Sequence, residues 1–269
     1  MHDLGHTTPL LATSAIRLDH GRVAEVDELL AEEIPISMVY NGVSHAVMMA
    51  SPADLEDFAI GFSLTEGLVH IASEITSIGI VRHRRGIELQ METSVDVAAG
   101  TRSRRLSGRT GCGLCGMEDV EQVLRALPRV QSSGSFSSTH IANAMAALAG
   151  QQPLNAASGA VHAAAWADRN GALAVAREDV GRHNALDKVV GAMARSGSDA
   201  RTGFIVLTSR GSFELVQKAA ILGVALVATV SAPTALAVRM AAEAGITLAG
   251  FARDGRVTVY THVERVLGS

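Results

Sequence analysis

Hydrophobic and polar positions between residues 31 and 106 follow the pattern of a small unit in which strands accompany one helix. Four short runs are rich in β-favouring side chains and are bounded by turn residues: 34–40, 44–49, 75–82 and 86–92. An Asn-Gly dipeptide at 41–42 separates the first two runs, as in two-residue hairpin turns. Ser51 as N-cap and Pro52 at the first helical position predict a helix that ends near Glu66. Together these elements predict a small α+β domain.

From residue 139 onward, helical and strand patterns alternate. Helical spacing of apolar residues occurs at 139–149, 182–194, 212–222 and 234–244. Strand-like runs occupy 160–167, 172–177, 204–208, 225–230, 247–251 and 256–260. Such alternation predicts a mostly parallel sheet between helices, with ligands at the carboxyl ends of its strands. The order of elements resembles the cytidine-deaminase-like fold, so we predict the α/β class: a cytidine-deaminase-like three-layer domain with a smaller α+β N-terminal domain.

These patterns divide the chain into four segments. They are an N-terminal tail at 1–30, the small α+β domain at 31–106, a cysteine loop and connecting helix at 107–138, and the deaminase-like α/β domain at 139–269. The run at 101–116 is polar, glycine-rich and cationic, and it has no apolar face to bury, so it predicts a linker or loop. Residues 117–127 have the apolar spacing of a helix.

Composition restricts the classes of protein that remain. The 269 residues are 48% hydrophobic and 19% charged, which supplies one large or two ordinary cores and excludes disordered and fibrous chains. A formal net charge of -4 offers no general excess of cations to nucleic acid. No stretch reaches about 18 uninterrupted apolar residues, and the first thirty residues lack the pattern of a signal peptide. We therefore expect a cytoplasmic protein that binds neither nucleic acid nor membranes.

Basic residues are distributed unevenly between the two types. Of the 23 Lys and Arg residues, only Lys188 and Lys218 are lysines. The preference for arginine agrees with a bias in base composition, so it carries no functional conclusion. We expect both lysines to lie on helix surfaces.

Both cysteines, Cys112 and Cys115, belong to one C-x-x-C motif, which in a reducing compartment indicates metal, redox or sulfur chemistry. The surrounding GCGLCG also satisfies G-x-G-x-x-G, but no strand precedes it, as a dinucleotide-binding loop requires. Its three glycines leave the two thiols little shielded. Upstream arginines and the beginning of the helix predicted at 117–127 favour the thiolate over the thiol. The cysteines are therefore candidate nucleophiles.

The cysteine pair has two other interpretations. It could form half of a four-ligand zinc site, completed by two histidines or by a second subunit. It could also belong to a dithiol oxidoreductase, although the thioredoxin-like arrangement of C-x-x-C at a helix after a strand does not surround it. We favour persulfide or redox chemistry over a metal site and rank the dithiol oxidoreductase last.

Two predicted helices, 182–194 and 212–222, begin where deaminases of this fold carry their zinc ligands. Neither cysteine ligands nor a suitably spaced acid stand there, so the zinc-activated water of deamination cannot be assembled. Arg182, Arg210 and Gly211 near these helix starts suit an anionic group such as phosphate, and ordinary loop residues without a ligand are the alternative. We expect the histidines of this region to be structural residues and not ligands.

Four ordered blocks resemble the formate dehydrogenase accessory sulfurtransferase (FdhD) family: RTGCGLCG at 109–116, REDVGRHNALDKVVG at 177–191, TSRGSFELVQKA at 208–219 and FARDGR at 251–256. The resemblance extends over nearly the whole chain after about residue 30. It implies a sulfurtransferase that carries sulfur as a cysteine persulfide. The sulfur would come from a cysteine desulfurase and pass to the molybdenum cofactor, bis-molybdopterin guanine dinucleotide, before insertion into formate dehydrogenase. A deaminase-like domain with a smaller domain, often as a homodimer, is also implied.

The resemblance also assigns roles to residues. It places the persulfide on Cys112, and for Cys115 we hypothesise a helper role in sulfur relay or protection. FARDGR alone would indicate only a hairpin loop, but the resemblance makes it the cofactor-contacting segment: Phe251, Ala252, Arg253, Asp254, Gly255 and Arg256. Because guanidinium groups form two-point contacts with phosphate, we add Arg182, Arg210 and Gly211 to this site.

On this interpretation the molybdenum cofactor is a bound substrate, and we expect no permanently bound metal. The alternative is a zinc-binding or guanine-nucleotide-sensing module whose C-x-x-C ligands pair across a dimer.

Overall fold

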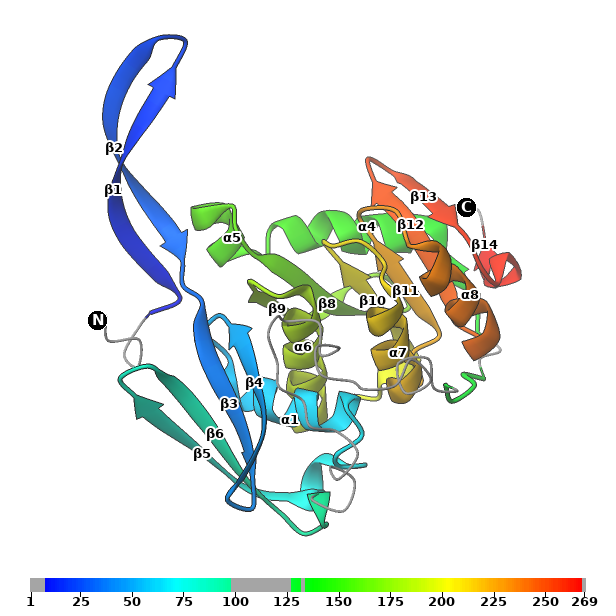
Figure 1. Cartoon of the computed structure of the whole chain (residues 1–269). Helices are drawn as coiled ribbons and strands as arrows, with labels where there is room; N and C mark the ends of the chain where they lie inside the picture. The colour runs from blue at the N-terminus through cyan, green and yellow to red at the C-terminus, as the bar shows by residue number, and fades with distance from the viewer. Residues whose placement is uncertain (1–7, 98–126, 132–133, 268–269) are drawn as a thin grey trace.

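The computed structural model describes residues 8–97, 127–131 and 134–267 (Figure 1). Within these residues, a six-stranded sheet with its helices forms the larger unit, and a four-stranded sheet with helix α1 (Leu55–Thr65) forms the smaller one. A two-stranded hairpin near the N-terminus projects away from both units.

The larger sheet has the strand order β13-β12-β11-β10-β8-β9. Its strands are β8 (His162–Asp168), β9 (Leu173–Asp179), β10 (Gly203–Leu207), β11 (Leu226–Thr229), β12 (Thr247–Arg253) and β13 (Arg256–Val259). Only β10, β11 and β12 run parallel, and the other three neighbouring pairs are antiparallel. The prediction of a mostly parallel sheet is therefore wrong. Short turns connect β8 to β9 and β12 to β13, and a short turn can join only antiparallel neighbours.

Helices lie on both sides of this sheet. Figure 1 shows α4 (Ser138–Ala149) on one face and α6 (Arg182–Ser196), α7 (Phe213–Leu222) and α8 (Ala235–Ala244) on the other. The main core lies between these layers, and all five residues of β10 are buried in it. The predicted α/β class is confirmed, whereas its cytidine-deaminase-like description stays a prediction.

The smaller sheet has the order β4-β3-β6-β5 and contains the four strands expected from the sequence. They are β3 (Ile34–Tyr40), β4 (Val43–Ala50), β5 (Ile75–His83) and β6 (Gly86–Thr93). The central pair, β3 and β6, is parallel, and the outer pairs are antiparallel hairpins. Its core is separate from that of the larger sheet.

Helix α1 (Leu55–Thr65) begins later than the sequence predicts, because Ser51 has another role. The Ser51 N–H donates to Asp179 Oδ2 (3.0 Å), and its Oγ accepts from the N–H of Val180 (3.1 Å). Ser51 therefore joins the two units and does not cap the helix, and the N-cap position falls to Asp54. The helix lies between the small sheet and α6, and nine of its eleven residues are buried.

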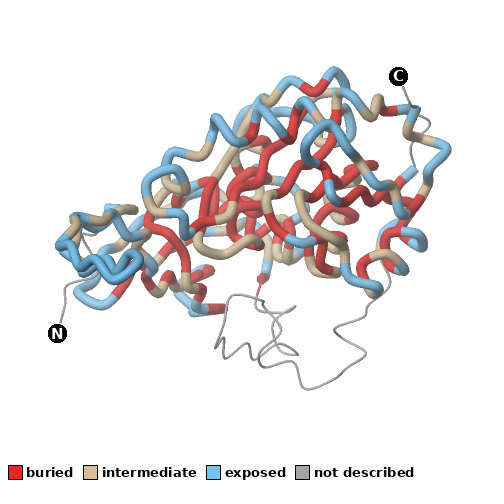
Figure 2. The backbone as a smooth tube through the Cα atoms, turned by 90° about the horizontal axis from the view of Figure 1, so that it is seen from above, coloured by how far each residue is buried: buried red, intermediate tan, exposed pale blue. Residues whose placement is uncertain are grey.

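The hairpin arm consists of β1 (Leu10–Asp19) and β2 (Arg22–Ala31), where the sequence predicts only a tail over 1–30. His20 and Gly21 connect the strands with positive φ angles of 45° and 83°, as a two-residue hairpin turn requires. The arm carries six exposed large apolar side chains: Leu11, Ile16, Leu18, Val23, Leu29 and Leu30. In Figure 2, which views the molecule from above, the arm lies at the left, points towards the viewer and is mainly exposed.

The remaining elements are short. They are α5 (Pro153–Ser158), the parallel pair β7 (Phe136–Ser137) and β14 (Val266–Leu267), and 3-10 turns at Ala72–Glu74, Ala200–Thr202 and Val263–Arg265. Within the described ranges, no helix combines the length and the apolar character that crossing a bilayer requires.

Candidate functional site

The carboxyl ends of β10, β11 and β12 meet at one edge of the larger sheet because these three strands are parallel. Beyond β10, Gly211 forms a β-bridge with Pro233 of the segment that follows β11. Beyond β12, the N–H of Phe251 donates to the carbonyl of Ser231 in that same segment (3.3 Å). The fold therefore brings the predicted residues Gly211 and Phe251 to one place on the sheet edge.

Arg182 and Arg210 lie around His162, the first residue of β8, at the same edge. Burial lowers the pKa of His162, and the nearby charges of Arg182, His183 and Arg210 lower it further, while Asp179 opposes them. Arg182 is the first residue of α6, and Arg210 lies in the loop that leads to α7. The structure thus places two of the predicted anion-binding arginines near each other, at the beginnings of two helices.

Two buried polar atoms at the beginning of α6 have no hydrogen-bond partner among the described residues. They are Arg182 Nε and Asn184 Oδ1. Ser212 is 8% exposed, and its side chain makes no cap hydrogen bond although it is the N-cap of α7. Buried polar atoms are nearly always paired, so Arg182 Nε and Asn184 Oδ1 mark the beginning of α6 as part of the candidate site.

His183 of α6 and Glu214 of α7 face each other, with Nε2 and Oε2 separated by 3.8 Å. Burial opposes ionisation of Glu214, but hydrogen bonding by His183 and Ser212 outweighs it and lowers the pKa of Glu214 to about 2. Glu214 is therefore an anion at neutral pH. Sequence reasoning assigned no function to this pair.

The predicted segment at 251–256 has two parts with different surroundings. Ala252 is buried, whereas Phe251 is 41% exposed, and the β12–β13 register shifts between Gly250 and Arg253. Asp254 and Gly255 form the turn with positive φ angles, and Arg253 and Arg256 are exposed beside it. Neither guanidinium has a hydrogen bond or ion pair to another described residue, so both are available to an external anion.

Cys112 and Cys115 lie outside the described residues, as do residues 117–126 of the helix predicted at 117–127. In the ranges that the structure covers, no group of three or more His, Cys, Asp or Glu side chains could hold a metal ion.

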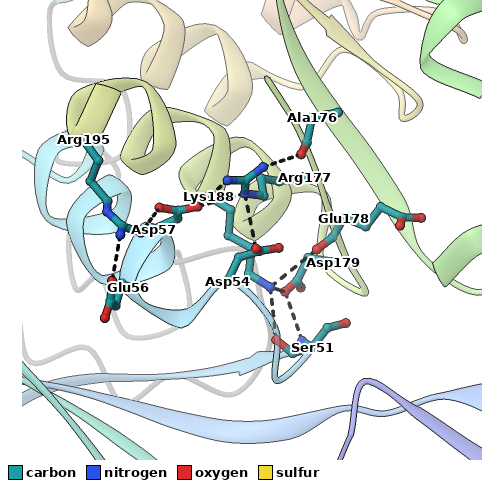
Figure 3. A network of polar contacts seen from close by, with 10 residues as sticks. All are labelled: Ser51, Asp54, Glu56, Asp57, Ala176, Arg177, Glu178, Asp179, Lys188 and Arg195. Carbon is teal, nitrogen blue, oxygen red and sulfur yellow. Dashed lines mark hydrogen bonds and ion pairs between the residues drawn. The ribbon is translucent and has the colours of Figure 1, made fainter. Parts of the chain in front are cut away.

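Lys188, expected on a helix surface, is instead fully buried behind the beginning of α6. Its Nζ donates to Asp179 Oδ2 (2.6 Å) and to the carbonyl of Ser51 (3.1 Å), as Figure 3 shows. The second carboxylate oxygen of Asp179 accepts from the N–H of Gly181 (2.7 Å) and from Asn184 Nδ2 (2.9 Å). This network fixes Gly181, which directly precedes Arg182, and Asn184, which lies two residues after it.

Lys218 is also buried, at 7% exposure, which again corrects the surface prediction. Its Nζ lies 2.9 Å from Asp187 Oδ1 and 3.0 Å from Glu66 Oε1, and it donates to Thr65 Oγ1 (2.9 Å). Burial opposes the charge of Lys218, but Asp187 and Glu66 outweigh it and raise its pKa. The lysine therefore joins α7 to both α6 and α1.

Asp57 of α1 supplies a third contact between the units. This buried carboxylate accepts from Arg177 Nε at the end of β9 and from a terminal nitrogen of Arg195 in α6, both at 2.8 Å (Figure 3). Arg195 also reaches Glu56 at 3.0 Å. Buried ionic contacts thus bind the small domain to the helices that carry the candidate site.

Comparison with known proteins identifies the family. The model of the FdhD/NarQ family matches residues 31–267, nearly the whole of the described chain after the arm. The chain belongs to the FdhD/NarQ family. The predicted resemblance is therefore confirmed, and the four sequence blocks that carry it all lie inside the matched range.

Two FdhD/NarQ relatives are named sulfur carrier protein FdhD. The protein from Bordetella petrii is 47% identical over 269 residues, which cover 98% of this chain and 97% of the relative. The protein from Xanthomonas axonopodis pv. citri is 52% identical over 248 residues, which cover 91% and 88%. A crystal structure of a formate dehydrogenase accessory protein from Desulfotalea psychrophila has the same fold, with a TM-score of 0.75 and a sequence identity of 24%. The match covers 96% of this chain and 99% of the chain in that structure.

Proposed function

We propose that this chain is a sulfur carrier, and so a sulfurtransferase, that serves the maturation of formate dehydrogenase. The observation that carries this proposal is its identity of 47% and 52% to proteins named sulfur carrier protein FdhD over nearly their whole length. The proposal places the reaction in the cytoplasm, where a reducing thiol pool keeps a C-x-x-C pair from forming a stable disulfide.

In the proposed reaction, the thiolate of Cys112 attacks the outer sulfur of a persulfide on a cysteine desulfurase. A new S–S bond forms on Cys112 as the donor's S–S bond breaks, and the donor cysteine leaves as a thiolate. Sulfur keeps its oxidation state overall, so no further oxidant or reductant is required. Cys115 would assist in relay or protection of the carried sulfur.

The acceptor in this proposal is the molybdenum cofactor bis-molybdopterin guanine dinucleotide, bound as a substrate before it enters formate dehydrogenase. Its phosphates would bind at the sheet edge, where Arg182 and Arg210 flank two helix beginnings and Gly211 permits close approach of the chain. The segment from Phe251 to Arg256 would contact the same substrate, with Arg253 and Arg256 exposed beside their turn.

Transfer of sulfur to the protein is tested by incubation with a cysteine desulfurase and cysteine, followed by mass spectrometry of the 110–116 peptide. We expect one added sulfur atom in the wild-type protein and none in Cys112→Ser. The matched variant Cys115→Ser should still acquire the sulfur. An active desulfurase that leaves the wild-type peptide unmodified would refute the proposal.

Substrate binding is tested separately with GDP as a probe for the nucleotide part of the cofactor. The double variant Arg253→Ala, Arg256→Ala and the single variant Arg210→Ala should each weaken binding about tenfold, since each loses charge-assisted contacts to phosphate. Arg239→Ala is the matched control because Arg239 is an exposed arginine on α8. Equal affinities in all four proteins would contradict the proposed site.

The alternative is a zinc-binding or guanine-nucleotide-sensing module in which the C-x-x-C pairs across a dimer. Metal analysis of the purified protein distinguishes it. Stoichiometric zinc that disappears in the double variant Cys112→Ala, Cys115→Ala would favour this alternative over the sulfur carrier.

We further propose a homodimer in which the hairpin arm of one copy lies on the other copy. A two-stranded hairpin is at best marginally stable in water by itself, and this one, although β2 lies beside α5, exposes Ile16, Leu18 and Val23 by 62–75%. The same chain exposes Val43 and Val47 on β4, an edge strand of the small sheet, as a surface of matching character. Sedimentation of the wild type should show a dimer, and replacement of the three arm residues by Thr should yield monomers. A monomeric wild type would contradict this assembly.

A further inference from the structure

We propose that His183 and Glu214 are positioning residues that hold the beginnings of α6 and α7 at the spacing that Arg182 and Arg210 need to bind an anionic nucleotide. This inference rests on the proposed function, because it concerns the same substrate site.

The two residues occupy equivalent positions. His183 is the second residue of α6 and directly follows Arg182, whereas Glu214 is the second residue of α7 and comes four residues after Arg210. Their side chains are only 5% and 12% exposed, and Nε2 lies 3.8 Å from Oε2. The pair therefore links the two backbone segments that carry the arginines.

A second ion pair joins the same helices one turn further along. Asp187 lies four residues after His183, and Lys218 lies four residues after Glu214, with Lys218 Nζ 2.9 Å from Asp187 Oδ1. Residues four apart share one face of a helix. The two pairs therefore form consecutive contacts between α6 and α7. In the outer contact, at the helix beginnings, the acidic residue is on α7. In the inner contact, one turn later, the acidic residue is on α6.

The two contacts respond differently to pH. Asp187 and Glu66 outweigh burial and raise the pKa of Lys218, so the lysine of the inner contact stays protonated. The outer contact is an ion pair only when His183 is protonated, because Glu214, with its pKa of about 2, is always an anion in the physiological range.

Charges from several elements meet beside this pair. His162 at the beginning of β8 interacts electrostatically with His183, Arg182 and Arg210, and with Asp179 at the end of β9. A protonated His183 gives Glu214 its ion-pair partner and adds one positive charge beside Arg182. Both effects favour the binding of a phosphate group.

The test is calorimetric titration of GDP into the purified full-length protein between pH 5.5 and 8.5. For the wild type we expect affinity to fall with rising pH. His183→Gln should bind GDP about five- to tenfold more weakly than the wild type at pH 5.5, as coupling energies of ordinary size imply, and should lose most of the pH dependence. His83→Gln is the matched control because His83 pairs with Glu88 at 3.4 Å on the small sheet, remote from the site.

Glu214→Gln separates positioning from simple electrostatics. Removal of a negative charge alone would strengthen the binding of an anion, whereas loss of the contact that spaces the helices weakens it. We expect weaker binding at pH 5.5, with an unchanged far-UV circular dichroism spectrum as the check of folding. Tighter binding in this variant, or a wild-type pH profile in His183→Gln, would overturn the inference and leave the proposed substrate site intact. A wild type that binds no GDP at any pH would overturn both.

Discussion

Gly61 of α1 lies so close to α6 that a Cβ atom at position 61 would stand 1.6 Å from the carbonyl oxygen of Asp187. The approach is reciprocal, because a Cβ atom on Gly191 of α6 would stand 1.8 Å from the carbonyl oxygen of Asp57 in α1. The two helices therefore pack backbone against backbone where they meet. This contact, flanked by the ionic network of Figure 3, attaches the small domain to the helix that begins at Arg182.

Gly61→Ala should destabilise the protein substantially. The added methyl group would collide with backbone atoms, which cannot rotate aside as a side chain can, so α1 must move away from α6. We expect a loss of about 3 kcal/mol in the free energy of unfolding, at the upper end of the usual cost of overpacking. Urea unfolding at neutral pH measures it through the shift of the transition midpoint.

Gly79→Ala is the matched control for this substitution. A Cβ atom at position 79 would have Gln90 Cβ as its nearest neighbour at 3.7 Å, an ordinary van der Waals distance. Its unfolding midpoint should stay near that of the wild type. Similar midpoints for the two variants would show that the helices do not approach as closely as described.

Lys188 and Lys218 should resist amine-reactive reagents in the native protein. They are the only lysines of the chain, and they are 0% and 7% exposed, each held by a buried carboxylate. Reaction with an N-hydroxysuccinimide ester, followed by peptide mass spectrometry, should show neither lysine modified under native conditions. Both should react once the protein is unfolded in guanidinium chloride. Rapid native labelling at either position would contradict its burial.

Local sequence patterns were sufficient for most strands and helices. The Asn-Gly turn and its flanking apolar runs correspond to β3 and β4, and the alternation after residue 139 corresponds to the helices and strands of the larger unit. The arm was missed because its apolar residues face solvent on both sides, so no alternation towards a core marks β1 or β2. Its turn signal, His20-Gly21, is weaker than Asn-Gly.

Contacts between distant segments could not be predicted in the same way. Ser51 looks like an N-cap, and only the presence of Asp179 beside it in space shows that it joins two units. Arg182, Arg210 and Gly211 were expected around two helix beginnings, and they lie at or before the first residues of α6 and α7, whereas their role in binding an anion stays a prediction. For the pair of His183 and Glu214, one sequence signal was available: each has a residue of opposite expected charge four positions later on its helix.

Replacement of Lys188 by Met should leave the carboxylate of Asp179 buried without its cation. Removal of one partner of a buried ion pair usually costs about 3–5 kcal/mol, and we expect a loss in that range. A double-mutant cycle with Asp179→Asn provides the control. Because the second substitution removes the uncompensated charge, the double variant should be more stable than the sum of the two losses predicts, by about 1–3 kcal/mol. Additive losses would show that the two side chains do not interact as described.

Glu214 should make the stability of the protein depend on pH in acid. Hydrogen bonding by His183 and Ser212 outweighs burial and lowers the pKa of Glu214 from 4.5 to about 2, so the folded state favours the ionised carboxylate more than the unfolded state does. Its contribution to stability is therefore present above pH 4.5 and disappears as the pH falls towards 2. Glu214→Gln should be less stable than the wild type at pH 7, and the difference should shrink as the pH is lowered to 3. His183→Gln removes one of the two neighbours and should reduce the same pH dependence in urea unfolding. The free energies of unfolding of the wild type and Glu214→Gln could instead differ by the same amount from pH 7 to pH 3. That result would show that the beginnings of α6 and α7 do not stabilise the charged form of this carboxylate.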